Sequence, residues 1–86
     1  MVGAMKTQIR DILAAHAGLP VAVETLADDA DLYQAGLRSF ASVTLMLALE
    51  DAFDIEFPED ALNRKTFQSI DAIAEVVSGV MQRKAA

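Results

Sequence analysis

Ser39 is the residue whose type and position best suit a nucleophile, because this small hydroxyl residue stands at the start of a long apolar run. The 86-residue chain contains no cysteine, which excludes a thiol nucleophile, a disulfide and a thiolate metal site. A serine nucleophile needs a base beside it, and the sole histidine is His16. His16 falls on the apolar side of the segment 2–17, so we expect its side chain to be partly buried and to have a structural role. The sequence therefore predicts no catalytic residue and no enzyme, with a serine enzyme that uses His16 as its base as one alternative.

Acidic residues are plentiful, but their spacing does not indicate a metal site. Asp28, Asp29 and Asp31 lack the glycine and the bidentate glutamate that follow in a calcium-binding loop. The chain also has no glycine-rich phosphate loop. We expect these carboxylates to lie on a solvated loop and the chain to bind no metal.

Ser39 has two possible roles at the start of a helix. Its oxygen could cap the helix by accepting a hydrogen bond from a backbone N–H group one turn on. Alternatively it could carry a phosphate ester, which the helix dipole and the free N–H groups of the first turn would stabilise. Arg38 could then pair with that phosphate. An apolar line of Phe40, Val43 and Leu47 begins at the same end and offers a surface for a partner.

The formal net charge of −6 is concentrated in the middle of the chain, where ten acids lie between Glu24 and Asp60 with Arg38 as the one base. Such a surface repels the phosphate backbone of nucleic acids and attracts basic protein surfaces. The start of the chain lacks the pattern of a secretory signal, and no run approaches the roughly 20 apolar residues of a membrane span. We expect a cytoplasmic monomer that binds neither nucleic acid nor membranes.

Apolar spacing predicts the elements that must position Ser39. Residues 2–17 show a helical stripe that Gly18 and Pro20 end. Residues 18–38 show no sustained period, and a connection of that length tends to be functional. Within it Asp31 is expected to cap a short turn, and Gly36 to let the backbone bend before Ser39. Residues 39–53 form a second helix whose core stripe includes Leu45 and Leu49.

The remaining residues complete an all-α fold. Pro58 interrupts any helix after Phe57, and residues 59–65 are long enough only for a short helix or turn. Ser69 is a plausible N-cap of a last helix. We therefore predict a single domain, residues 1–86, that forms a small four-helix bundle with three main helices, a short third helix and a long first loop.

The chain resembles the acyl carrier and peptidyl carrier proteins over essentially its whole length. The resemblance rests on the pattern Asp31-Leu32…Gly36-Leu37-Arg38-Ser39-Phe40…Leu45…Leu49-Glu50…Phe53-Asp54-Ile55…Phe57-Pro58. It implies a four-helix bundle whose second helix begins with a serine that receives 4′-phosphopantetheine from coenzyme A. It also implies that the thiol missing from the sequence is imported on a flexible arm, whose tether raises the effective concentration of the cargo.

The resemblance also implies a docking surface for partner proteins. The chain departs from the pattern of the family at one point, the residues on either side of Ser39. Relatives usually have Asp-Ser-Leu where this chain has Arg38-Ser39-Phe40, so the reversed charge bears on which transferase and which partner dock. Partners of the family contact the second helix with basic residues. Glu50 and Asp51 are expected to supply the charge for that contact, and Phe40, Val43 and Leu47 the apolar area.

Within the family, two segments are most similar to small stand-alone bacterial carriers, residues 36–43 and 62–67. Some of those carriers are charged with an amino acid by ligases that resemble class II aminoacyl-tRNA synthetases. The expected partners are a phosphopantetheinyl transferase, a ligase that loads an acyl or aminoacyl group as a thioester, and a downstream acyl-transfer enzyme. The alternative is an unmodified helical adaptor that kept the carrier shape.

Overall fold

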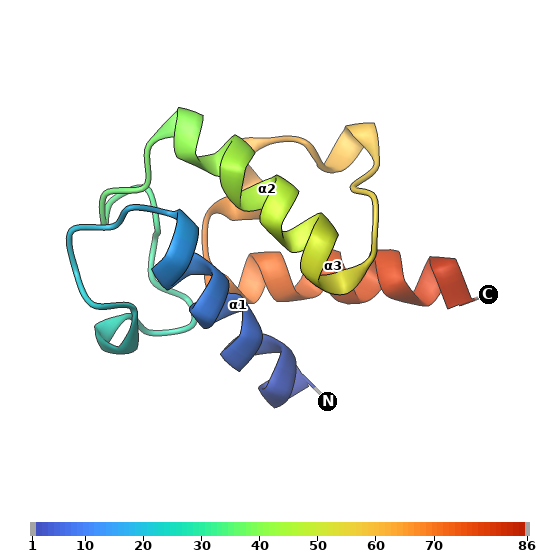
Figure 1. The fold of residues 1–86 in the computed structure, drawn as a ribbon, viewed down its shortest axis with the longest axis horizontal. Helices are drawn as coiled ribbons and strands as arrows, with labels where there is room; N and C mark the ends of the chain where they lie inside the picture. Colours follow the sequence, from blue (N-terminus) through green and yellow to red (C-terminus); the bar gives the residue numbers. More distant parts are fainter. Residues whose placement is uncertain (1, 86) are drawn as a thin grey trace.

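The computed structural model describes residues 2–85 and shows three α-helices connected by long irregular segments (Figure 1). Helix α1 spans Val2–His16, α2 spans Ser39–Phe53 and α3 spans Ile70–Ala85. Three short 3-10 helices lie between them: η1 at Val23–Thr25, η2 at Glu59–Ala61 and η3 at Arg64–Phe67. The all-α prediction is confirmed, and the short third helix takes the form of η2 and η3. Residues 1 and 86 of the expected domain lie outside the described residues.

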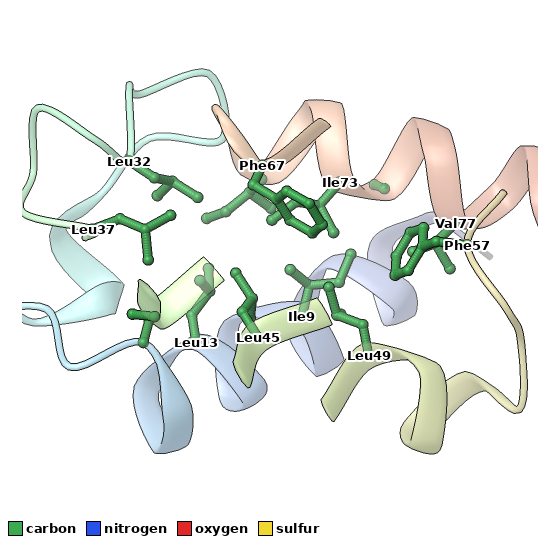
Figure 2. Packing of buried hydrophobic residues seen from close by; sticks show 14 of the residues in the cluster. Ile9, Leu13, Leu32, Leu37, Leu45, Leu49, Phe57, Phe67, Ile73 and Val77 are labelled. Atoms are coloured by element: carbon green, nitrogen blue, oxygen red, sulfur yellow. The ribbon is translucent and has the colours of Figure 1, made fainter. Parts of the chain in front are cut away.

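The three α-helices pack around one apolar core. Figure 2 shows buried side chains of α1, α2 and α3 pointing toward one another: Ile9, Leu13, Leu45, Leu49, Ile73 and Val77. Each helix contributes a stripe at helical spacing, so burial of these stripes drives the bundle together. No helix within residues 2–85 has both the length and the apolar character that a membrane span requires.

The long connection between α1 and α2 is fixed to the rest of the bundle. Leu32 and Leu37 are buried in the core, and the Leu32 N–H donates to the Gln68 carbonyl at 2.7 Å. Asp31 Oδ1 accepts from the backbone N–H groups of Tyr33 at 2.9 Å and Gln34 at 3.2 Å, which confirms the predicted turn. This anchoring determines where the chain enters α2.

Gly36 is required by the shape of this turn. Its φ is +120°, a conformation that residues with a side chain rarely adopt. A Cβ atom at this position would also lie 2.5 Å from Pro20 Cδ. The predicted bend at Gly36 is confirmed, and it depends on close contact with the Pro20 ring.

A cluster of ion pairs joins α1 to the connection and to α3. Arg10 Nη2 lies 2.6 Å from Asp28 Oδ1, and Lys6 Nζ lies 3.3 Å from Asp28 Oδ2 and 2.6 Å from Asp71 Oδ1. The hydrogen bond from Arg10, followed by that from Lys6, lowers the pKa of Asp28 below its ordinary value of 3.8. The hydrogen bond to Asp71 is the main cause that raises the pKa of Lys6 above 10.5. Asp28 thus has a structural role.

His16 is exposed, so the prediction of a partly buried side chain is wrong. It is the last residue of α1, one turn beyond the point where Leu13 enters the core, and the buried residue there is Ala17. The buried line of this segment runs through Ile9, Leu13 and Ala17 at intervals of four residues, and His16 lies outside it.

Candidate functional site

Ser39 is the first residue of α2, and its side chain is exposed. Arg38 holds the N-cap position in an extended conformation and provides no side-chain hydrogen bond. Ser39 is therefore not the N-cap, and among the described residues its hydroxyl has no hydrogen-bond partner. By contrast Ser69 caps α3 as predicted, because its Oγ accepts from the Ala72 N–H at 3.0 Å.

Ser39 opens onto a groove of about 390 Å³ that lies between α2 and the η2–η3 segment. Figure 1 shows this segment next to α2. The rings of Phe57 and Phe67, 5.8 Å apart and edge to face, anchor the segment to the core. The lining of the groove combines apolar and polar side chains: Tyr33, Ser39, Ser42, Val43, Met46, Leu62, Asn63, Arg64 and Phe67.

The polar side of the groove is held by local contacts. Asn63 Oδ1 accepts from the Thr66 N–H at 3.2 Å, and Asn63 Nδ2 donates to the Asp60 carbonyl at 2.9 Å. The Arg64 guanidinium carbon lies 4.1 Å from the centre of the Tyr33 ring, in a cation–π arrangement. Sequence reasoning missed Tyr33, Asn63 and Arg64 as site residues. The capping pattern from Asn63 to Thr66 is the signal that points to an ordered turn there.

Among the residues that the structure describes, the groove at Ser39 lacks the side chains that most often serve as a general base. Its lining residues include no histidine, aspartate, glutamate or lysine, and His16 is not among them. An unassisted serine hydroxyl is a weak nucleophile at neutral pH. The arrangement suits a hydroxyl that another enzyme modifies.

The apolar line on α2 is exposed and begins beside Ser39. Phe40, Val43 and Leu47 are 73%, 54% and 56% exposed, and Val43 also lines the groove. Together they form an exposed apolar line on α2, the kind of surface that a partner protein can cover. The structure thus brings three of the predicted partner-binding residues together with the predicted attachment site.

The charged residues predicted for the site lie outside the groove at Ser39. Arg38 is exposed and does not line the groove. Glu50 is half-buried, and its Oε2 accepts from the Phe57 N–H at 2.9 Å. Asp51 is exposed, but the helical rise of 1.5 Å per residue places it about 18 Å from Ser39 along α2. Of the two acids, only Asp51 is free of such an internal contact.

Comparison with known proteins agrees with this arrangement. Residues 7–77 match the profile of the PP-binding family, described as a phosphopantetheine attachment site. The chain is 57% identical over 82 residues to an aminoacyl carrier protein of Agrobacterium fabrum, covering 95% of this chain and 99% of that protein. It is 37% identical over 71 residues to a D-alanyl carrier protein of Lactococcus lactis subsp. cremoris, covering 81% and 87%.

A solved structure has the same fold at high identity. It is a crystal structure of an engineered Bradyrhizobium japonicum glycine:[carrier protein] ligase complexed with a carrier protein from Agrobacterium tumefaciens and ATP. The match has a TM-score of 0.86 and 59% identity, and it covers 88% of this chain and 99% of that chain. The chain therefore belongs to the phosphopantetheine attachment site family, as a carrier protein whose prosthetic group is 4′-phosphopantetheine.

Proposed function

We propose that Ser39 is the attachment site of 4′-phosphopantetheine and that this single domain, residues 1–86, carries an activated aminoacyl group. The observation that supports this most directly is the exposed Ser39 hydroxyl, which has no internal hydrogen bond within residues 2–85. An oxygen that caps no helix and fills no core is available to a modifying enzyme.

The residues around Ser39 fit such a group. Modification adds a phosphodiester to the first turn of α2, where the helix dipole and the N–H groups favour an anion. Val43, Met46 and Phe67 give the groove apolar surface, and Ser42 and Asn63 give it hydrogen-bonding groups. When attached, the group supplies the thiol that holds the cargo as a thioester and that this chain lacks.

The proposed cargo is an amino acid, and the proposed loading enzyme is a ligase that activates it with ATP. The similarity to an aminoacyl carrier protein and to a structure that contains a glycine:[carrier protein] ligase supports both statements. A phosphopantetheinyl transferase and a downstream acyl-transfer enzyme complete the set of partners. The domain itself catalyses no step, which is supported by a groove lining around Ser39 that, within residues 2–85, includes no histidine, carboxylate or lysine to activate the hydroxyl.

These partners dock on the apolar line of α2. Phe40, Val43 and Leu47 supply the contact area next to the attachment site. Asp51 supplies charge at the far end of the same helix, while Glu50 is engaged by the Phe57 N–H and contributes less.

Modification of Ser39 is tested with Ser39→Ala and the matched variant Ser42→Ala. Ser42 lies one turn further along α2 and lines the same groove. After incubation with coenzyme A and a broad-specificity transferase, wild type and Ser42→Ala gain the mass of one phosphopantetheine, and Ser39→Ala gains none. A mass gain in Ser39→Ala, or none in wild type while a known carrier is modified in parallel, contradicts the proposal.

The cargo is tested on the modified protein with ATP and either an amino acid ligase or a fatty acyl ligase. The expected product is the aminoacyl form, which disappears on treatment with hydroxylamine because a thioester is cleaved. Loading by the fatty acyl ligase alone would overturn the assignment of the cargo while leaving the modification of Ser39 intact.

A further inference from the structure

Arg64 combines two features that suit it to bind an anion at the groove. Its guanidinium carbon lies over the Tyr33 ring, 4.1 Å from the ring centre, and both residues line the groove that contains Ser39. A guanidinium that lies over an aromatic ring uses none of its N–H groups in conventional hydrogen bonds there, so they stay available to a phosphate, with which arginine forms paired hydrogen bonds. Tyr33 thus holds the cation in place without neutralising it.

The charge of Arg64 is not balanced within the part of the chain that the structure describes. The ion pairs there involve Lys6 and Arg10 with Asp28 and Asp71, and no carboxylate pairs with Arg64. No acid of the described residues lines the groove either. An anion placed beside Ser39 therefore meets a positive potential from Arg64 and from the start of α2.

Arg38 is adjacent to Ser39 in sequence but, unlike Arg64, lies outside the groove. It holds the extended N-cap position with φ −91° and ψ 152°, is exposed, and is not part of the groove lining. Proximity in sequence suggested Arg38 as the phosphate partner, whereas the structure places Arg64 in the groove with Ser39.

We propose that Arg64 is a positioning residue that pairs with the phosphodiester joining the arm to Ser39, and that Arg38 is not its partner. This inference rests on the proposed attachment at Ser39. The ion pair holds the first bonds of the arm against the α2–η3 side of the molecule. Arg38 then stays available to enzymes that dock at the start of α2.

The test compares unmodified and modified protein by nitrogen and phosphorus NMR in wild type and three variants. Arg64→Gln removes the proposed cation, Arg38→Gln removes the alternative one, and Lys65→Gln removes an exposed charge next to Arg64 that does not line this groove. All three positions are exposed, so the variants keep the fold, which their amide spectra verify. Mass spectrometry first establishes that each sample carries the group on Ser39.

The expected result has three parts. Modification shifts the Arg64 Nε–Hε resonance of wild type. The phosphorus resonance of the modified protein is displaced by Arg64→Gln and unchanged by Arg38→Gln or Lys65→Gln. Raising the salt concentration to about 0.5 M moves the wild-type phosphorus resonance toward that of Arg64→Gln, because exposed ion pairs are screened.

The inference is overturned if the modified protein shows no shift at Arg64, or if the phosphorus resonance responds to Arg38→Gln and not to Arg64→Gln. Either result leaves the attachment at Ser39 in place. A mass spectrum without the group on Ser39 overturns the proposed function itself, and the inference with it, so the two failures are distinguished before any NMR measurement.

Discussion

Ser39 and Ser69 both stand at the start of a helix, yet their hydroxyls have different surroundings. Ser69 precedes α3 and accepts a hydrogen bond from Ala72, whereas Ser39 follows the N-cap residue Arg38 and makes none within residues 2–85. A shift of one position along the chain thus separates a structural serine from one that is available for modification.

At the residue scale, Gly36→Ala is expected to lower the free energy of unfolding by about 1–3 kcal/mol. The positive φ disfavours any side chain, and the added methyl group would collide with the Pro20 ring. Urea denaturation measures the change. The matched variant is Gly79→Ala, whose Cβ meets nothing within 4 Å in α3. It should stabilise by up to about 1 kcal/mol, since alanine is the better helix former. Equal stability of Gly36→Ala and wild type would contradict the described turn.

At the scale of the element, α2 has one buried face and one exposed apolar line, which we propose contacts partners. Phe40→Ala should change the free energy of unfolding by less than about 0.5 kcal/mol, because the ring is mostly exposed. The same change should raise the KM of the transferase or the ligase for this carrier about tenfold, the effect expected of an aromatic anchor at an interface.

Leu45→Ala provides the opposite pattern on the same helix. Leu45 is fully buried, so its truncation should cost about 2–5 kcal/mol of stability. Urea denaturation and steady-state kinetics on both variants distinguish the two faces. A stability loss in Phe40→Ala as large as that in Leu45→Ala would show that the apolar line is part of the core.

The two acids near the end of α2 are also expected to differ. Glu50→Ala leaves the N–H of the buried Phe57 without its acceptor, which should cost about 1–3 kcal/mol, whereas Asp51→Ala should be nearly neutral. Conversely, only Asp51→Ala should reduce the salt dependence of partner binding. Urea denaturation and binding at two salt concentrations test both statements. Neutral stability in Glu50→Ala would show that its contact with Phe57 is unimportant.

At the scale of the whole molecule, the Asp28 cluster makes stability depend on pH. The folded pKa of Asp28 is lowered, so its stabilisation is complete above the ordinary value of 3.8 and is lost as pH falls through the folded pKa. Lys6 has a raised pKa, so its contribution is complete below 10.5 and is lost as pH rises through the folded pKa. Stability should therefore decline at both ends of this range.

Asp28→Asn is expected to lower the urea midpoint near neutral pH, and the difference from wild type should shrink as pH falls below 3.8. Asp29→Asn is the matched control, because Asp29 is exposed and has no ion pair with a described residue. A difference between Asp28→Asn and wild type that does not vary with pH would contradict the role of the cluster.

The sequence alone predicted most of the fold because its apolar periods are strong. The bounds of α2 follow from an apolar run that begins after Gly36 and Arg38 and ends before Pro58. The end of α1 was harder, since His16 fits the apolar spacing but is exposed, whereas the buried line continues through Ala17. Periodicity indicates the apolar side of one helix and does not tell which residues at the edge of that side are covered by a neighbouring element.

The candidate site could be predicted only in part. Ser39 and the apolar line lie on one helix, so local sequence places them together. Tyr33 and Arg64 come from segments without a period, and tertiary packing brings them into one groove with Ser39. No local pattern encodes that contact, because it depends on how the connection and η3 are anchored to the core.

The central claim, that Ser39 carries the arm, is tested most directly by fragmenting the modified protein in a mass spectrometer. The informative peptide contains both Ser39 and Ser42, so the fragment ions separate the two hydroxyls. The account predicts that the mass of phosphopantetheine resides on Ser39 alone. Its presence on Ser42 or on any other residue, with Ser39 unmodified, would contradict it.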